Sequence, residues 1–182
     1  LSTAFDILRS STVTGLFALG VVIVLAAGGI DVSFTAIAVL TMYAITKAVL
    51  GYWPEAPFFL IIGSGALIGA ALGACNGYMI DRLRVPSLIV TIGTQYLLRG
   101  FLLTFVGTLF FMVIPQSMDG FGRIALLNYT AQDGTTAMLP ASVLVLVAAA
   151  VVTWFLLNRT LMGRAIYAMG GNLAIAERLG YN

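Results

Sequence analysis

The chain offers very few side chains that could carry out covalent chemistry. Its 182 residues include no histidine and a single cysteine, Cys75. A histidine-assisted nucleophile, a zinc cluster and an internal disulfide are therefore all excluded. The one lysine, Lys47, follows no glycine-rich loop, so the sequence lacks the loop that would cradle ATP phosphates. We therefore expect no catalytic residue, no bound metal and no cofactor on this chain.

A few polar side chains stand inside otherwise apolar stretches and are the candidates for binding. Thr91, Gln95 and Arg99 are spaced four residues apart, so they share one face of a helix, with Thr94 close by. A charge such as Arg99 inside a membrane must face protein or water rather than lipid. The face could be a structural anchor, with Arg99 held by a neighbouring carbonyl or carboxylate, or it could line the path of a solute. The candidates for a solute path are Asp31, Ser33, Asn76, Thr91, Gln95 and Arg99.

Residues 28–33, which read GGIDVS, interrupt a long apolar run. Two glycines weaken a helix, and an ionised Asp31 at full membrane depth would cost about 2.5–3.5 kcal/mol or more. The simplest interpretation is a tight turn near the cytoplasmic surface, in which Asp31 or Ser33 caps the following helix. The alternative is a broken helix that lines a translocation path.

The elements that must position these residues are membrane-spanning helices. The chain is 60% apolar and only 9% charged, whereas soluble domains carry about 25% charged residues. A net charge of +2 is too small for nucleic-acid binding. A helix needs about 20 apolar residues to cross a bilayer, and the runs lack the alternation of barrel strands. We predict an all-α, polytopic helical bundle with spans at about 12–30, 32–50, 57–80, 88–112 and 138–157.

The arginines in short loops predict the orientation of these spans. Five of the nine basic residues lie in the loop 81–84 and in the segment 158–182. Because positive loops stay inside, we place both regions in the cytoplasm and the polar segment 113–137 outside. Residues 1–9 fit either a short interfacial helix that feeds the first span or a frayed tail.

The third predicted span carries a glycine at every fourth position. At 3.6 residues per turn these glycines form one smooth stripe, which lets another helix approach closely. Tight helix packing is the favoured interpretation, and a glycine-lined pore is the alternative. The four residues are Gly65, Gly69, Gly73 and Gly77.

Beyond the fifth span the sequence becomes amphipathic and basic. We therefore divide the chain into a membrane core, 1–157, and a cytoplasmic segment, 158–182. Asn172 can cap a short helix that Gly180 ends. One face of this helix would carry Leu173, Ala176 and Leu179. Such an element fits either a docking site for a cytoplasmic partner or an ordinary interfacial helix resting on the bilayer.

Three segments resemble signatures of the ribose-type ABC transporter permeases. Residues 28–33 are similar to the GIDLS-type signature, and 84–100 contain stretches similar to the family's arginine–valine–proline and leucine–arginine–glycine segments. Residues 163–172 read GRAIYAMGGN and, with Ala176 and Gly180, resemble the segment that forms the cytoplasmic coupling loop in that family. The three matches keep their order along the chain.

The resemblance implies a multi-pass permease subunit of a bacterial inner membrane, within a type II-like fold of about ten spans of which this chain holds the second to the sixth. It implies ATPase subunits that carry ATP and Mg, a second permease copy or paralogue, an extracytoplasmic sugar-binding protein, and a lipid bilayer as surroundings. The expected function is translocation of a monosaccharide or a similar small neutral solute by alternating access. The residues expected to couple to the ATPase are Gly163, Arg164, Gly170, Gly171, Asn172, Ala176, Glu177 and Gly180.

The main alternative function is half of an ion-coupled secondary transporter. Such proteins normally place acidic or histidine groups within their spans, and Asp31 is the one candidate in this chain. An intramembrane enzyme would need a catalytic pair inside the membrane, which the sequence does not offer.

Overall fold

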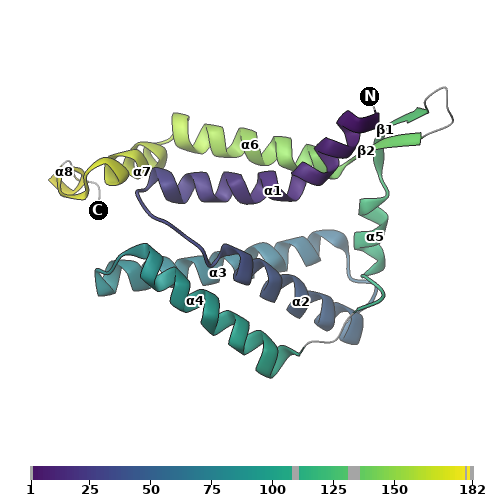
Figure 1. Ribbon diagram of the computed structural model, residues 1–182, viewed down its shortest axis with the longest axis horizontal. Coiled ribbons are helices and arrows are strands. Elements are labelled where there is room, and N and C mark those ends of the chain that lie inside the picture. Colours follow the sequence, from purple (N-terminus) through teal and green to yellow (C-terminus); the bar gives the residue numbers. More distant parts are fainter. Residues whose placement is uncertain (1, 108–110, 131–135, 179, 181–182) are drawn as a thin grey trace. The chain divides into compact units, whose positions relative to one another are not determined.

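The computed structural model describes residues 2–107, 111–130, 136–178 and 180. Contacts divide the chain into two compact units, Ile30–Phe121 and the combination of Leu1–Gly29 with Gly122–Asn182. Helices dominate both units (Figure 1): α1 (Ser2–Ala26), α2 (Phe34–Tyr52), α3 (Phe58–Leu83), α4 (Ser87–Phe101) with the π-helical turn η1 (Leu102–Val106), α5 (Gln116–Gly122), α6 (Ser142–Arg159), α7 (Leu161–Gly171) and α8 (Leu173–Arg178).

Five of the described helices are long and apolar enough to cross a bilayer, which confirms the predicted polytopic helical fold. They are Thr3–Ala26, Phe34–Tyr52, Phe58–Leu83, Ser87–Val106 and Ser142–Arg159. The all-α expectation missed one antiparallel hairpin, β1 (Ala125–Thr130) with β2 (Thr136–Pro140). This hairpin and α5 occupy the polar segment that the sequence analysis treated as a plain loop.

The first helix differs from the prediction at both ends. No separate helix covers residues 2–9, because α1 runs unbroken from Ser2 to Ala26. The segment contains neither glycine nor proline before Gly15, so nothing interrupts the backbone hydrogen bonding. At the other end, Gly28 adopts φ +79°, a left-handed conformation that stops the helix before the predicted residue 30.

The fourth span is also shorter than predicted. Helix α4 gives way to η1, and Gly107 with φ +107° ends the helical segment, so it does not reach residue 112. The Nζ of Lys47 donates to the carbonyl oxygen of Val106. A cation at this position complements the negative end of the helical segment.

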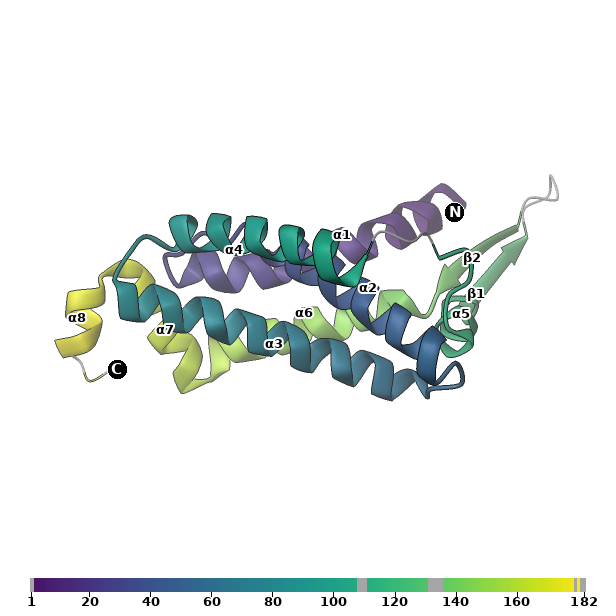
Figure 2. The same ribbon diagram turned by 90° about the horizontal axis from the view of Figure 1, so that it is seen from below.

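In the unit made by both ends of the chain, α1 and α6 lie along each other (Figure 1). A Cβ on Gly15 would come within 2.9 Å of the Leu146 side chain, so the absence of a side chain allows the two helices to approach closely. Helices α7 and α8 then continue from the end of α6 toward the C-terminus (Figure 2).

In the unit Ile30–Phe121, α2 packs against both α3 and α4. Its small buried core consists of Ala36, Leu40 and Leu98. Of the four stripe glycines, Gly65 faces α2, where a Cβ would meet Ile45 at 3.5 Å. Within the described residues, a Cβ on any of the others would meet no atom within 4 Å: Gly69, Gly73 and Gly77. The packing role of these three glycines therefore stays a prediction.

Candidate functional site

A chain of hydrogen bonds joins three elements of the unit Ile30–Phe121. The Thr94 hydroxyl on α4 donates to Asn76 Oδ1 on α3 at 2.7 Å, and Asn76 Nδ2 donates to Ser33 Oγ at 2.8 Å. The Ser33 hydroxyl and its backbone N–H both donate to Asp31 Oδ1 at 2.7 Å. Ser33 is fully buried and Asn76 is 4% exposed. We call Asp31, Ser33, Asn76 and Thr94 the Asp31 network.

Two residues of the segment 30–33, Ile30 and Val32, bond to side chains of α4. Ser87 Oγ accepts from the backbone N–H of Ile30 at 2.8 Å. Thr91 Oγ1 donates to the carbonyl oxygen of Ile30 at 3.3 Å and accepts from the N–H of Val32 at 3.4 Å. These side chains take the place of the helical hydrogen bonds that the segment lacks. Irregular backbone within a membrane is tolerated only where protein or water satisfies it in this way.

The predicted turn before α2 is present, but neither Asp31 nor Ser33 caps α2 among the described hydrogen bonds. Ser33 stands at the N-cap position of α2, but its side chain makes no capping hydrogen bond. Its hydroxyl is taken up by the Asp31 network instead, and the Asp31 carboxylate accepts from the backbone two residues ahead, as in an Asx turn.

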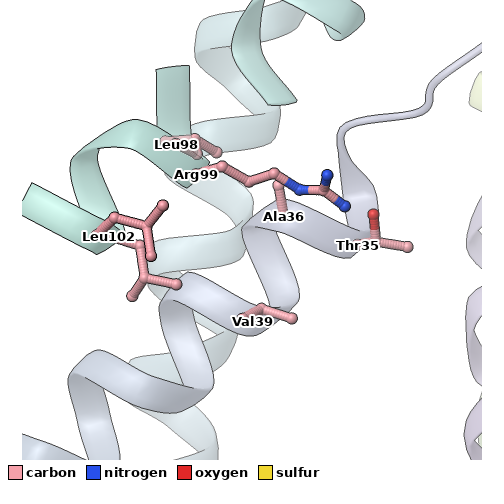
Figure 3. A pocket seen from close by; sticks show the side chains of 7 residues that line it. Thr35, Ala36, Val39, Leu98, Arg99 and Leu102 are labelled. Carbon is pink, nitrogen blue, oxygen red and sulfur yellow. The ribbon is translucent and has the colours of Figure 1, made fainter. Parts of the chain in front are cut away.

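Arg99 lies outside this network, on the wall of a cavity of about 290 Å³ between α2 and α4. Figure 3 shows its side chain extending past Ala36 toward Thr35 at the start of α2. No hydrogen bond or ion pair holds Arg99 among the described residues, so no anchor of the predicted kind is found there. Gln95 is half-buried and likewise has no described hydrogen bond.

The six predicted solute-path residues therefore do not form one surface. Asp31, Ser33 and Asn76 bond to one another, and Thr91 bonds to the segment 30–33. Of the six residues, only Arg99 both lines a described cavity and has no hydrogen-bond or ion-pair partner among the described residues. Ser87 was not among the predicted site residues, although the spacing of Ser87, Thr91 and Thr94 indicates a hydroxyl face on the helix.

The C-terminal segment begins with a sharp corner between α6 and α7. Thr160 caps α7, because its Oγ1 accepts from the N–H of Gly163 at 3.0 Å. A Cβ on Gly163 would stand 2.3 Å from the carbonyl oxygens of both Leu156 and Leu157. This corner therefore requires a glycine, which gives the first glycine of the GRAIYAMGGN segment a structural role.

The second glycine of that segment brings α7 against the end of α1. A Cβ on Gly170 would lie 2.1 Å from the carbonyl oxygen of Ala26 and 3.0 Å from the nitrogen of Gly28. The two backbones touch directly at this point, which the sequence analysis did not anticipate. Gly171, by contrast, has open space around it within the described residues.

The short helix predicted after Asn172 is present as α8 and stops before Gly180, whose φ is +84°. The carbonyl oxygen of Asn172 accepts from the N–H of Ala176 at 3.0 Å. Ala176 is fully buried, whereas Leu173, which was predicted to share its face, is 58% exposed, so the two residues do not form one buried face. Arg164 on α7 is exposed. Glu177 lies within α8, while its side chain and Leu179 are outside the described part of the chain.

Comparisons with known proteins agree with this architecture. Residues 3–182 match the protein family described as branched-chain amino acid transport system / permease component. Similar curated proteins include the ribose import permease of Haemophilus influenzae, 31% identical over 97% of this chain and 52% of the relative. The D-allose transport system permease of Escherichia coli is 32% identical over 92% of this chain and 48% of the relative.

A third relative is the autoinducer 2 import system permease of Klebsiella pneumoniae, 34% identical over 99% of this chain and 48% of the relative. The chain thus spans about half the length of the curated relatives that it matches. No solved structure matches it. Together with the five apolar helices, these matches identify a multi-pass protein of the bacterial inner membrane.

Proposed function

The chain belongs to the branched-chain amino acid transport system / permease component family, and from this premise we propose that it is part of the membrane-spanning subunit of an ATP-binding-cassette importer. Its cargo in this proposal is a monosaccharide or a similar small, neutral, sugar-like solute. The relatives named for ribose, D-allose and autoinducer 2 support this class of solute. The scarcity of charge in the spans also favours a neutral solute over an ion.

The single observation that carries the coupling part of the proposal is the pair of helices α7 and α8 at the C-terminal end. A short helix with a buried Ala176 and an exposed Leu173 can dock against a partner without unfolding. We propose that this partner is a separate ATPase subunit, which carries the ATP and Mg. A second permease copy or paralogue and an extracytoplasmic sugar-binding protein complete the proposed importer. The chain itself acts as a permease and not as an enzyme.

The contact between Gly170 and the end of α1 supplies a route for this coupling. A displacement of α8 would move α7, and the backbone contact with Ala26 would pass the movement to the first membrane helix. Nucleotide binding drives transport only if it stabilises one permease conformation over another. A docking helix tied directly to a spanning helix gives the ATPase a means of favouring one conformation, whereas docking equally tight in both conformations would shift nothing.

Arg99 is the candidate of the solute path with the most suitable surroundings. It lines the cavity between α2 and α4 and has no described partner, so its guanidinium can donate to a hydroxyl-rich solute. Gln95, one turn earlier, belongs to the same proposed path. The buried Ser33, Asn76 and Thr91 would shape the path by holding its walls in place.

The test uses the full-length protein with its ATPase and a tryptophan at an unobstructed glycine of α7. A Cβ at Gly171 meets no described atom within 4 Å, so Gly171→Trp has room to leave the helix and should keep the fold while docking is blocked. We expect at least a tenfold loss of co-purified ATPase and of ATP-dependent ribose uptake, with unchanged protein in the membrane.

The matched control is Gly120→Trp, since a Cβ at Gly120 also meets no described atom within 4 Å but the residue lies in the segment predicted to be external. It should leave ATPase co-purification unchanged. Normal recovery of the ATPase with Gly171→Trp would contradict the proposed docking site. Uptake that persists without ATP but is lost when an ion gradient is dissipated would contradict the proposed ATP-driven importer.

A further inference from the structure

The break between α1 and α2 contains Gly28 and Gly29, and such a break usually suggests a flexible joint. In the segment 30–33 that follows these glycines, however, every residue takes part in a hydrogen bond. Ile30 and Val32 bond to α4 through hydroxyl groups, and Ser33 bonds to Asp31 and Asn76. We infer that Ser87, Thr91 and Thr94 are positioning residues that tie the start of α2 to α3 and α4, so that these elements move as one block. The consequence for transport rests on the proposed function.

The three hydroxyl groups lie on one face of α4, four and three residues apart. Ser87 and Thr91 bond directly to Ile30 and Val32. Thr94 reaches Ser33 through Asn76. The hydroxyl face of α4 therefore supports the segment both directly and through α3.

The hydrogen bonds of the Asp31 network all run in one direction. Thr94 donates to Asn76, Asn76 donates to Ser33, and Ser33 donates to Asp31, which as a carboxylate can only accept. Removing one donor leaves its buried partner unsatisfied, and in surroundings of low dielectric constant this weakens the remaining bonds of the chain. The block is therefore expected to loosen as a whole when one member is removed.

This arrangement excludes the segment 30–33 as a place where α2 could turn on its own. During alternating access some elements must shift relative to others, and an unrestrained segment 30–33 would let α2 swivel alone. With the segment pinned to α4 and α3, the start of α2 cannot turn without them. We therefore assign Thr94 and Ser87 to the coupling of these three helices rather than to contact with the solute.

The first test is hydrogen–deuterium exchange of the full-length protein in lipid nanodiscs, without solute or nucleotide. Thr94 touches none of the amides of residues 30–33, so any effect on them must pass through the network. Thr94→Val should raise the exchange rate of these amides at least fivefold, and Thr94→Ser should restore the native rate. The matched control is Thr104→Val, an exposed threonine of η1 with no described side-chain hydrogen bond.

A second variant keeps the inference testable if Thr94→Val does not reach the membrane. Ser87→Ala frees the amide of Ile30 directly, and it should also raise the exchange of the Ser33 amide, which Ser87 does not contact. Native exchange at Ser33 in Ser87→Ala, or throughout 30–33 in Thr94→Val, would overturn the inference.

The transport arm measures solute carried per ATP hydrolysed in proteoliposomes. Thr94→Val should lower this ratio at least threefold, and Thr94→Ser should restore it. An unchanged ratio despite faster exchange would overturn the role in coupling. Because the exchange experiment needs no transport, absence of ATP-driven uptake in the unmodified protein would refute the proposed function while leaving the positioning role supported by exchange alone.

Discussion

Buried polar groups show how single residues specify the unit Ile30–Phe121. Ser33, Asn76 and Thr91 are buried, and each has hydrogen-bond partners on another element. Thr41 on α2 is different, because its Oγ1 is buried without any partner among the described residues. A buried hydroxyl without a hydrogen bond costs about 1–3 kcal/mol, whereas replacing it with an apolar group of the same shape relieves that cost.

We therefore expect Thr41→Val to leave the free energy of unfolding unchanged or to raise it by up to about 1 kcal/mol. Thr91→Val is the matched comparison: the same change should lower stability by about 1–3 kcal/mol, because it leaves backbone groups of Ile30 and Val32 unsatisfied. Thermal unfolding of the purified full-length variants would measure both. Equal losses of stability in the two variants would contradict this interpretation.

At the residue scale, the sequence was sufficient to identify which polar side chains matter but not what they contact. Asp31, Ser33, Asn76 and Thr91 stood out because polar residues are rare in apolar runs. Their partners could not be predicted, since Asn76 meets Ser33 across 43 residues and Thr91 meets Ile30 across 61. Ser87 follows a proline, as many helix starts do, and so carried no distinguishing signal.

At the scale of elements, the two adjacent glycines of the C-terminal segment have different roles. Gly170 is required by its contact with Ala26, whereas Gly171 meets nothing among the described residues. The segment GRAIYAMGGN thus contains one glycine that a close backbone contact requires and, next to it, one glycine that no described contact requires. The free position is the one available for a partner.

The comparison of Gly170→Ala with Gly171→Ala tests this difference. At Gly170 the added methyl would lie 2.1 Å from a carbonyl oxygen, so α7 must shift, and we expect a loss of about 1–3 kcal/mol. Gly171→Ala should leave stability unchanged or raise it by up to about 1 kcal/mol, because the methyl group enters open space and alanine favours the helix. Thermal unfolding of both full-length variants measures the contrast, and similar melting temperatures would contradict the described contact.

The helices themselves were largely predictable, and their ends were not. Continuous apolar runs identified all five spanning helices, because a bilayer demands length and hydrophobicity. The end of α1 depended on the conformation of Gly28, and the end of the fourth span on that of Gly107. The hairpin of β1 and β2 was missed because short strands in a polar segment lack a strong sequence pattern.

At the scale of the whole molecule, the distribution of arginines remains the basis for the orientation in the membrane. The division of the chain into two units could not be predicted, because it depends on α1 pairing with α6 more than a hundred residues away. The orientation depends on the positive-inside preference alone. It places the loop after α3 in the cytoplasm and the hairpin outside.

Single cysteines at Leu83 and Leu126 test this orientation in the full-length protein in intact cells. Both side chains are exposed, at 61% and 39%, so a thiol at either position is accessible to reagent. Cys75 would first be replaced by alanine, since it is exposed and would otherwise react. A membrane-impermeant maleimide should label Leu126→Cys from outside, and should label Leu83→Cys only after the membrane is opened.

A third cysteine supplies the internal control for depth. Leu67 is 72% exposed in the middle of α3, a helix expected to face lipid there, so Leu67→Cys should resist the impermeant reagent from both sides. Labelling of positions 83 and 126 from the same side would reverse or abolish the predicted topology. Labelling of Leu83→Cys from outside would also remove α8 from the cytoplasm, because the loop after α3 and the C-terminal segment are assigned to that side by the same arginine argument.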